Sequence, residues 1–167
     1  MSLMQNALNE PDYQRIKNVL RSIQQELDSE LVLLIDRTGQ QIACEGPAKD
    51  LDLTSIASLA AASLAATDEL ALTVGEKEFS ALFQQGRQRS IHISSLDNQF
   101  CLVLLFGERV SPGLVRWKVK RAAVTLTQVF HEQRRQAELA DEVVRASGGK
   151  SAPLFFTDED IEKLFGQ

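Results

Sequence analysis

The run from Leu53 to Thr67, LTSIASLAAASLAAT, contains no charged side chain, and nearly every residue in it favours a helix. A helix that contacts its own protein along one face normally carries charges on the other face. We therefore expect this helix to have no face reserved for water. Its bulky residues, Ile56, Leu59 and Leu64, are predicted to pack on a sheet, while its small residues lie where another backbone can approach closely. These small residues are Ser55, Ser58, Ala61, Ala62, Ala65 and Ala66.

A chain of 167 residues is long enough for one domain with a hydrophobic core and too short for two ordinary domains. Its 44% hydrophobic and 25% charged residues are typical of a globular protein. We see no apolar run close to the roughly 18 residues of a membrane-spanning helix, so we expect no membrane insertion. No secretory signal is recognisable, and we predict that residues 1–8 are a disordered N-terminus or the remnant of a tag.

The formal net charge of -5 argues against nucleic acid as a partner, because such a chain repels phosphate backbones. Cys44 and Cys101 lie in apolar, strand-like runs without metal-ligand spacing. Buried structural thiols are therefore favoured over a disulfide or a metal site, which weakly indicates the reducing cytoplasm.

The first third of the chain predicts a helix followed by a hairpin. Apolar residues recur at helical spacing over residues 11–27. An entirely apolar strand over Leu31–Ile35 is followed by a turn at Gly39 and by a shorter strand through Cys44. The first strand fits the centre of a sheet and the second fits a position nearer an edge. The uncharged helix comes next, capped by Asp52 or Thr54.

Three more strands follow Gly75. The first contains Phe79, Ala81 and Phe83, the second lies near residues 91–94, and the third, residues 100–106, is the most apolar of all. We place the third strand in the middle of the sheet, beside the strand over Leu31–Ile35.

The C-terminal third begins with a long helix after Ser111 and Pro112. Beyond Phe130 this helix is highly charged and is predicted to project into solvent or to pair with another copy. Residues 147–153 have the composition of a flexible linker. Residues 154–167 predict a short amphipathic helix, too short to persist in water unless it docks.

No familiar catalytic motif is present in the sequence. His92 alternates with isoleucines and is predicted to be a solvent-facing or hydrogen-bonded sheet residue, and His131 begins the charged part of the long helix. There is no phosphate-binding glycine loop, so the chain is not itself a P-loop GTPase. A less favoured idea is that one turn arginine stabilises phosphoryl transfer on a partner. The candidates are Arg37, Arg87, Arg89 and Arg109.

This order of elements resembles the Roadblock/dynein light chain family over about residues 11–130. Four stretches carry the resemblance: LVLLIDRTGQQIACEG, DLTSIASLAAASLAA, GEKEF at 75–79 and GLVRWKVKRA at 113–122. The acidic and aromatic segment FTDEDIEKLF is similar to the C-terminal helix of the bacterial MglB group within this family.

The resemblance implies an α+β, Roadblock (profilin-like) fold of three layers. A five-stranded antiparallel sheet ordered 2-1-5-4-3 would have helices on both faces, within a Roadblock domain spanning residues 9–146. Phe79, Ala81 and Phe83 would lie on an edge strand that pairs with the same strand of a second copy, giving a homodimer.

The resemblance also implies a function. Members of the MglB group bind one Ras-like MglA GTPase as a 2:1 complex and stimulate GTP hydrolysis in bacterial polarity and motility. This chain would then be a regulator without its own catalytic site, metal or cofactor. The implied GTPase-binding residues are Ser58, Ala61, Ala62, Ala65 and Ala66. A second contact, associated with nucleotide exchange, maps onto Phe156, Ile161, Leu164 and Phe165.

Two alternatives stay open at this point. A Roadblock scaffold or adaptor subunit, without any effect on nucleotide chemistry, explains the uncharged helix and the edge strand equally well. The uncharged helix is also compatible with complete burial inside the homodimer, with no GTPase involved.

Overall fold

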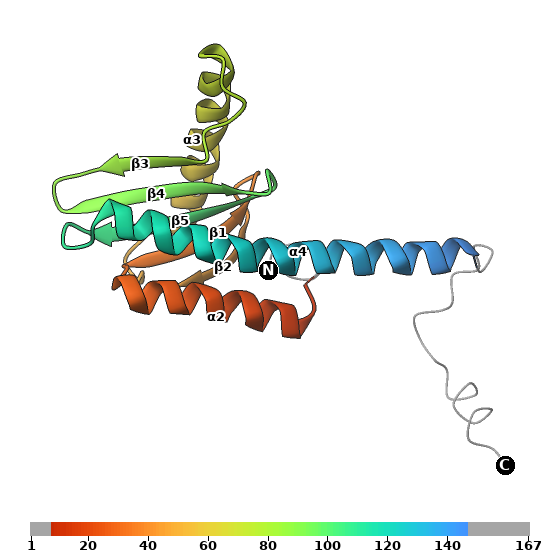
Figure 1. Cartoon of the computed structure of the whole chain (residues 1–167). Helices are drawn as coiled ribbons and strands as arrows, with labels where there is room; N and C mark the ends of the chain where they lie inside the picture. The colour runs from red at the N-terminus through yellow and green to blue at the C-terminus, as the bar shows by residue number, and fades with distance from the viewer. Residues whose placement is uncertain (1–7, 147–167) are drawn as a thin grey trace. The chain divides into compact units, whose positions relative to one another are not determined.

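A computed structural model describes residues 8–146 and shows a five-stranded antiparallel sheet with helices on both faces (Figure 1). The strand order is β2-β1-β5-β4-β3, so the predicted architecture and topology are confirmed. The elements are α2 (Glu10–Leu27), β1 (Leu31–Asp36), β2 (Gln41–Glu45), α3 (Leu53–Thr73), β3 (Ala81–Gln85), β4 (Arg89–Leu96), β5 (Phe100–Gly107) and α4 (Pro112–Ala146).

The two most apolar strands lie side by side in the centre of the sheet, as predicted. β1 pairs with β5 from Leu31 opposite Leu105 to Asp36 opposite Phe100, and every residue of β1 is buried. A strand covered on both faces cannot alternate apolar with polar side chains, which explains the uninterrupted apolar runs. β2 and β3 occupy the two edges.

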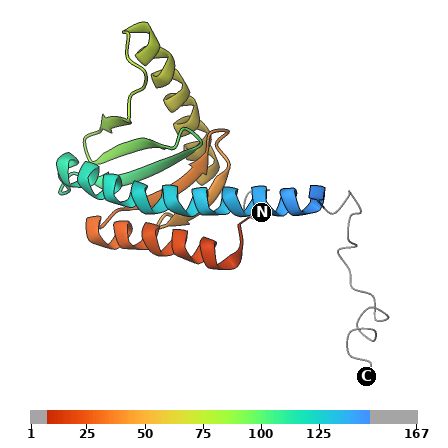
Figure 2. The same cartoon turned by 45° about the vertical axis from the view of Figure 1, so that its right-hand side comes forward.

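Helices α2 and α4 cover one face of the sheet (Figures 1 and 2). The side chain of Asn9 caps α2 by accepting the backbone N–H of Asp12 at 2.9 Å, and Ser111 Oγ accepts the N–H of Leu114 at 3.2 Å at the start of α4. The interior of this layer is made of large side chains. They include Ile16, Leu20, Leu27, Leu102, Leu104, Phe106, Val115, Leu126 and Val129.

Helix α3 covers the opposite face with much smaller side chains. Ala57, Ala60, Ala61 and Leu64 belong to the same buried cluster as β1 and β5 residues such as Leu33. Because these four residues follow helical spacing of three and four, they form one face that lies close to the sheet. The predicted sheet contact of Leu59 is wrong, since this side chain is 67% exposed.

The boundaries of α3 differ from the sequence expectation at one end. Asp52 is the cap, because its carboxylate accepts the backbone N–H of Ser55 at 3.0 Å. The helix continues past the end of the uncharged run to Thr73. Asp68, the first charged residue after that run, lies within the helix and forms an ion pair with Arg37.

By length and composition, α3 is the one helix within residues 8–146 that qualifies as a candidate membrane span; 28% of the qualifying window is buried. The expectation that no run approaches this length is therefore corrected, because the helix extends beyond Thr67. The core helix of a soluble protein meets the same criterion. In this chain one face of α3 packs on the sheet through Ala57, Ala60 and Leu64.

By internal contacts the chain divides into two units, Met1–Phe130 and His131–Gln167. The first unit contains the sheet, and the described part of the second is the charged end of α4, whose Leu139, Val143 and Val144 are exposed. The predicted linker at 147–153 and the predicted helix at 154–167, with Phe156, Ile161, Leu164 and Phe165, lie outside the described residues. Residues 1–7 lie outside them too.

Candidate functional site

The candidate site is the outward face of α3, which carries small and apolar side chains. Of the residues predicted to bind a partner, Ser58, Ala62, Ala65 and Ala66 are exposed, as is Ser55. Ala61 is not on this face, because it is only 9% exposed and packs on the sheet.

Two leucines belong to this surface: Leu59, which was predicted to pack on the sheet, and Leu70, which the sequence analysis did not assign. Leu59 is 67% exposed and Leu70 is 55% exposed. In the structure Ala57, Ala60 and Leu64, at i, i+3 and i+7, pack on the sheet, which places Leu59 on the far side of the helix. The sequence carries no clear signal for this arrangement, because alanines occur all around the helix. Below, the α3 surface means Ser55, Ser58, Leu59, Ala62, Ala65, Ala66 and Leu70.

The turn between β1 and β2 fixes α3 at two points. The Arg37 guanidinium donates through Nη2 to the Asp68 carboxylate. Gly39 has φ of 87°, and a Cβ atom there would lie 3.0 Å from Ser58 Cα and 3.2 Å from the Ala57 carbonyl oxygen. Glycine is therefore required both by the positive φ and by the close approach of the helix. These two contacts hold α3 against the β1–β2 turn.

The electrostatics at this junction favour the ion pair. The hydrogen bond with Asp68 is the main reason why the pKa of Arg37 is raised, so the guanidinium stays charged. Cys101, on β5, lies nearby, and burial raises the pKa of its thiol above the ordinary value. This cysteine is therefore a neutral, buried thiol at pH 7, which agrees with its predicted structural role.

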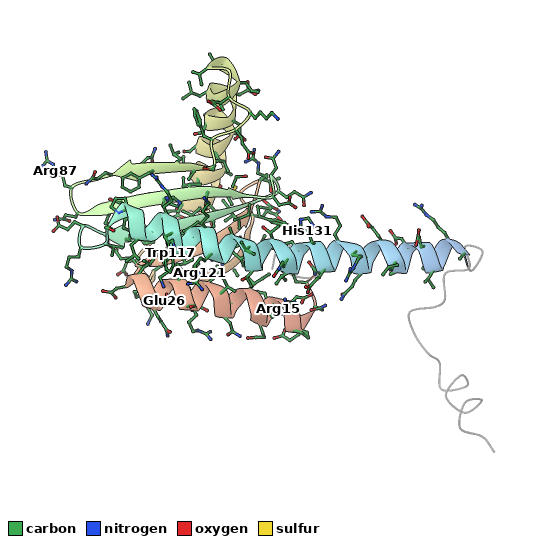
Figure 3. All side chains as sticks on the ribbon, in the orientation of Figure 1. Arg15, Glu26, Arg87, Trp117, Arg121 and His131 are labelled. Carbon is green, nitrogen blue, oxygen red and sulfur yellow. The ribbon has the colours of Figure 1, made fainter. Side chains whose placement is uncertain are left out.

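Two of the four turn arginines are engaged in ion pairs. Arg37 contacts Asp68, and Arg89 Nη2 lies 2.8 Å from Glu30 Oε2. Arg87 and Arg109 are exposed, and Figure 3 shows Arg87 at the tip of the β3–β4 hairpin. A side chain tied to a carboxylate is poorly suited to reach into a partner's phosphate site, so Arg37 and Arg89 are weak candidates for such a role.

The second candidate surface is the β3 edge of the sheet. Ala81 and Phe83 lie on β3, whereas Phe79 precedes the strand, so its predicted place on the edge strand is wrong. Phe83 points toward the α2/α4 side, where its ring stacks on Phe106 at a centroid distance of 6.2 Å. Within residues 8–146, β3 is the last strand of the sheet and pairs with β4 alone, so its outer edge is open for pairing.

The opposite edge is protected. Lys17 Nζ donates to the carbonyl oxygen of Cys44 at 2.7 Å and lies 2.6 Å from Glu45 Oε1. The register between β1 and β2 also shifts between Leu34 and Ile35. A lysine ammonium from α2 that occupies a carbonyl oxygen of the edge strand and an irregular register both disfavour further pairing. The two edges of this sheet are therefore not equivalent.

The buried His92 and the acidic and thiol side chains of the described residues are not arranged as a catalytic site. His92 is 3% exposed, not solvent-facing, and burial together with the charge of Arg116 lowers its pKa. A neutral imidazole under α4 has no access to a substrate. In the part of the chain that the structure describes, no three His, Cys, Asp or Glu side chains converge as metal ligands.

Comparisons with known proteins agree with this geometry. The Roadblock/LC7 domain family model matches residues 15–106. The structure of Myxococcus xanthus MglB is 33% identical, covers 75% of this chain and 95% of that chain, and has a TM-score of 0.71. The gliding protein MglB from Thermus thermophilus is 31% identical over the same shares, 75% and 95%, with a TM-score of 0.70.

A third structure, MglB with a tetrameric arrangement, is 32% identical, covers 75% of this chain and 95% of that chain, and has a TM-score of 0.71. Curated protein sequences give no match. The resemblance seen in the sequence is thus supported by both the family model and the structural neighbours.

Proposed function

The chain belongs to the Roadblock/LC7 domain family, and from this premise we propose that it is an MglB-like, homodimeric activator of a small Ras-like GTPase. The observation that carries the proposal is the α3 surface, which is exposed, apolar and free of charge between Ser55 and Ala66. A surface of this kind on a rigid element is typical of a protein-binding site.

The proposed dimer forms through β3. Pairing of two β3 edges around a two-fold axis joins two sheets into one, and it places both α3 helices on the same face. Ala81, Leu82 and Phe83 are only half-buried in the single chain, which leaves apolar area for a second copy to cover. One GTPase would then lie across the two α3 surfaces in a 2:1 complex.

Activation in this proposal needs no catalytic group from the regulator. A partner that binds only the hydrolysis-competent conformation of an MglA-type GTPase increases the population of that conformation, in which the GTPase's own groups orient water and stabilise the phosphates. The ion pairs that hold Arg37 and Arg89 are consistent with a regulator that donates no arginine. We propose accordingly that the chain is not itself an enzyme.

The remaining parts of the proposal concern the C-terminus and the cellular setting. Phe156, Ile161, Leu164 and Phe165 are proposed as a second contact with the GTPase that favours nucleotide exchange. We propose that the protein acts in the cytoplasm, where GTP is abundant, in control of cell polarity or motility. One of its relatives carries the description of a gliding protein.

The test is GTP turnover by an MglA-type GTPase, measured with and without this protein. Ala62→Arg places a bulky charge in the centre of the exposed α3 surface, and we expect stimulation to fall at least about tenfold, equivalent to about 1.4 kcal/mol of lost complex stability. Ala137→Arg, at an exposed alanine of α4, is the matched control and should leave stimulation unchanged.

Two results would contradict the proposal. If wild-type protein binds the GTPase and turnover does not rise, the chain is a Roadblock scaffold or adaptor. If Ala62→Arg stimulates as well as the wild type does, the GTPase does not bind at the α3 surface.

A further inference from the structure

The first half of α4 has a charge opposite to that of the whole chain. No aspartate or glutamate occurs between Glu108 and Glu132, and residues 116–121, RWKVKR, contain four cations. The formal net charge of the chain is -5. The positive charge is therefore concentrated on one short segment instead of being distributed over the surface.

Exposed apolar side chains accompany these cations. Leu114 is 43%, Trp117 51% and Val124 61% exposed. They lie three and seven residues apart, so they share one face of the helix. Lys118 Nζ and Arg121 Cζ lie 5.0 and 4.9 Å from the centre of the Trp117 ring, so two cations contact this ring.

Most of these cations are not neutralised by an internal partner. Lys118 forms an ion pair with Glu26 on α2. For Arg116, Lys120 and Arg121 the structure of residues 8–146 gives no carboxylate partner. Three such cations beside exposed Leu114 and Trp117 make up a surface that solubility alone does not require. We call this set the α4 ridge: Leu114, Arg116, Trp117, Lys120, Arg121 and Val124.

We propose that the α4 ridge binds the surface of an anionic phospholipid bilayer. An amphipathic helix with apolar residues along its centre and lysine or arginine beside them lies in the interfacial plane, with the cations near lipid phosphates. Tryptophan is the side chain that most favours the headgroup level. The ridge combines all three features within about three turns of helix.

The hollow beside the ridge argues against an acidic peptide as the occupant. It lies between α2 and α4 and has a volume of about 370 Å³, and its one carboxylate, Glu26, already occupies Lys118. The remaining lining residues are Asn18, Val19, Ser22, Ile23, Arg121, Ala122 and Thr125. An acidic peptide with an apolar anchor needs an apolar socket without a competing carboxylate. A bilayer contacts the protruding ridge and needs no socket.

This proposed surface lies on the face of the sheet opposite α3 (Figure 2). Lipid binding there and partner binding on the α3 surface do not compete for the same residues. The lipid proposal goes beyond the GTPase proposal, and its test contains no GTPase, so either one can fail alone.

The experiment is sedimentation of the full-length protein with vesicles. We expect binding to phosphatidylcholine vesicles that contain phosphatidylglycerol, little binding to pure phosphatidylcholine, and weaker binding in high salt. Trp117 is the single tryptophan of the chain, so its emission should shift to the blue when the ridge reaches the bilayer.

Charge reversal separates the ridge from general charge effects. Arg116→Glu with Lys120→Glu should reduce vesicle binding at least about tenfold, since each cation near an anionic surface contributes about fivefold. Lys77→Glu with Arg87→Glu makes the same charge change at exposed positions elsewhere and should have a much smaller effect. Trp117→Ala, which keeps the charge, should also weaken sedimentation.

Three results would overturn the proposal. These are equal binding to neutral and anionic vesicles, equal loss in both charge-reversed variants, and a shift of Trp117 emission with polyglutamate but not with anionic vesicles. The last result would identify an acidic protein as the occupant.

Discussion

The two faces of the sheet are covered in contrasting ways. On one face, α2 and α4 pack through large side chains such as Ile16, Leu20 and Leu126, all 0% exposed. On the other, α3 packs mainly through alanines, with Leu64 as the one fully buried large side chain in the helix. The first layer buries much more apolar area per turn and therefore contributes more to stability.

The difference indicates a division between stability and binding. Alanines toward the sheet let α3 lie close, and its leucines at positions 59 and 70 are then left for solvent or a partner. The α2/α4 layer instead uses its large residues internally. Truncation of a leucine should consequently lower stability far more in the α2/α4 layer than on the α3 surface, and the following predictions test the contrast from the largest expected effect to the smallest.

Leu20→Ala should cause the largest loss, about 2–5 kcal/mol of unfolding free energy, because it leaves a cavity in the α2/α4 layer. Leu59→Ala removes the same atoms from the α3 surface and should change stability by less than about 0.5 kcal/mol. Urea denaturation followed by circular dichroism measures both. Similar losses in the two variants would show that Leu59 is buried and that the contrast is false.

Ala60→Leu should cost about 1–3 kcal/mol, because the enlarged side chain has no room between α3 and the sheet. The same change at exposed Ala62 is the control and should be close to neutral. Denaturation of the two variants side by side tests how closely α3 approaches. If Ala60→Leu is tolerated like Ala62→Leu, α3 is not held close to the sheet.

Gly39→Ala and Gly75→Ala separate backbone strain from crowding. Both glycines have positive φ, 87° and 83°, so each substitution should cost about 1–2 kcal/mol. Only at Gly39 would the new Cβ meet a neighbour, at 3.0 Å from Ser58 Cα, whereas nothing lies within 4 Å at Gly75. Thermal denaturation should show the larger loss for Gly39→Ala, and equal losses would mean that α3 moves away without cost.

The stability of the α2/α4 layer should depend on pH through the buried His92. Burial lowers the pKa of His92, so the folded state favours the neutral imidazole, while the unfolded chain takes up a proton below the ordinary value of 6.5. Stability should thus fall as pH decreases from 6.5 toward the lowered pKa, and should be unaffected by this group at higher pH. His92→Phe should reduce the difference between the urea denaturation midpoints measured in a mildly alkaline and in a mildly acidic buffer. An unchanged difference would assign the pH effect to other groups.

Elements with a distinctive pattern could be predicted from sequence. The apolar runs of β1 and β5 predicted a shared central position, and Ser111 and Asp52 could be identified near helix starts because capping residues act locally. The strand order came from the family resemblance and is confirmed.

The failures have a physical cause in each case. An alanine fits equally well against a sheet or against solvent, so the uncharged run did not reveal which side of α3 faces inward, and Leu59 and Ala61 were exchanged. Phe79 continued an alternating pattern although the strand begins two residues later, at Ala81. The pairing of Arg37 with Asp68 spans 31 residues and leaves no local sequence signal.

The ammonium of Lys17 on the carbonyl of Cys44 limits how far sheets of this protein can grow. A molecule with two open borders could add copies indefinitely, as fibrils do. Because the β2 edge is blocked and the β3 edge is open, pairing of two copies through β3 leaves no open strand border for a third copy. Association through strands is then self-terminating, and Lys17→Ala would be the change that removes the stop.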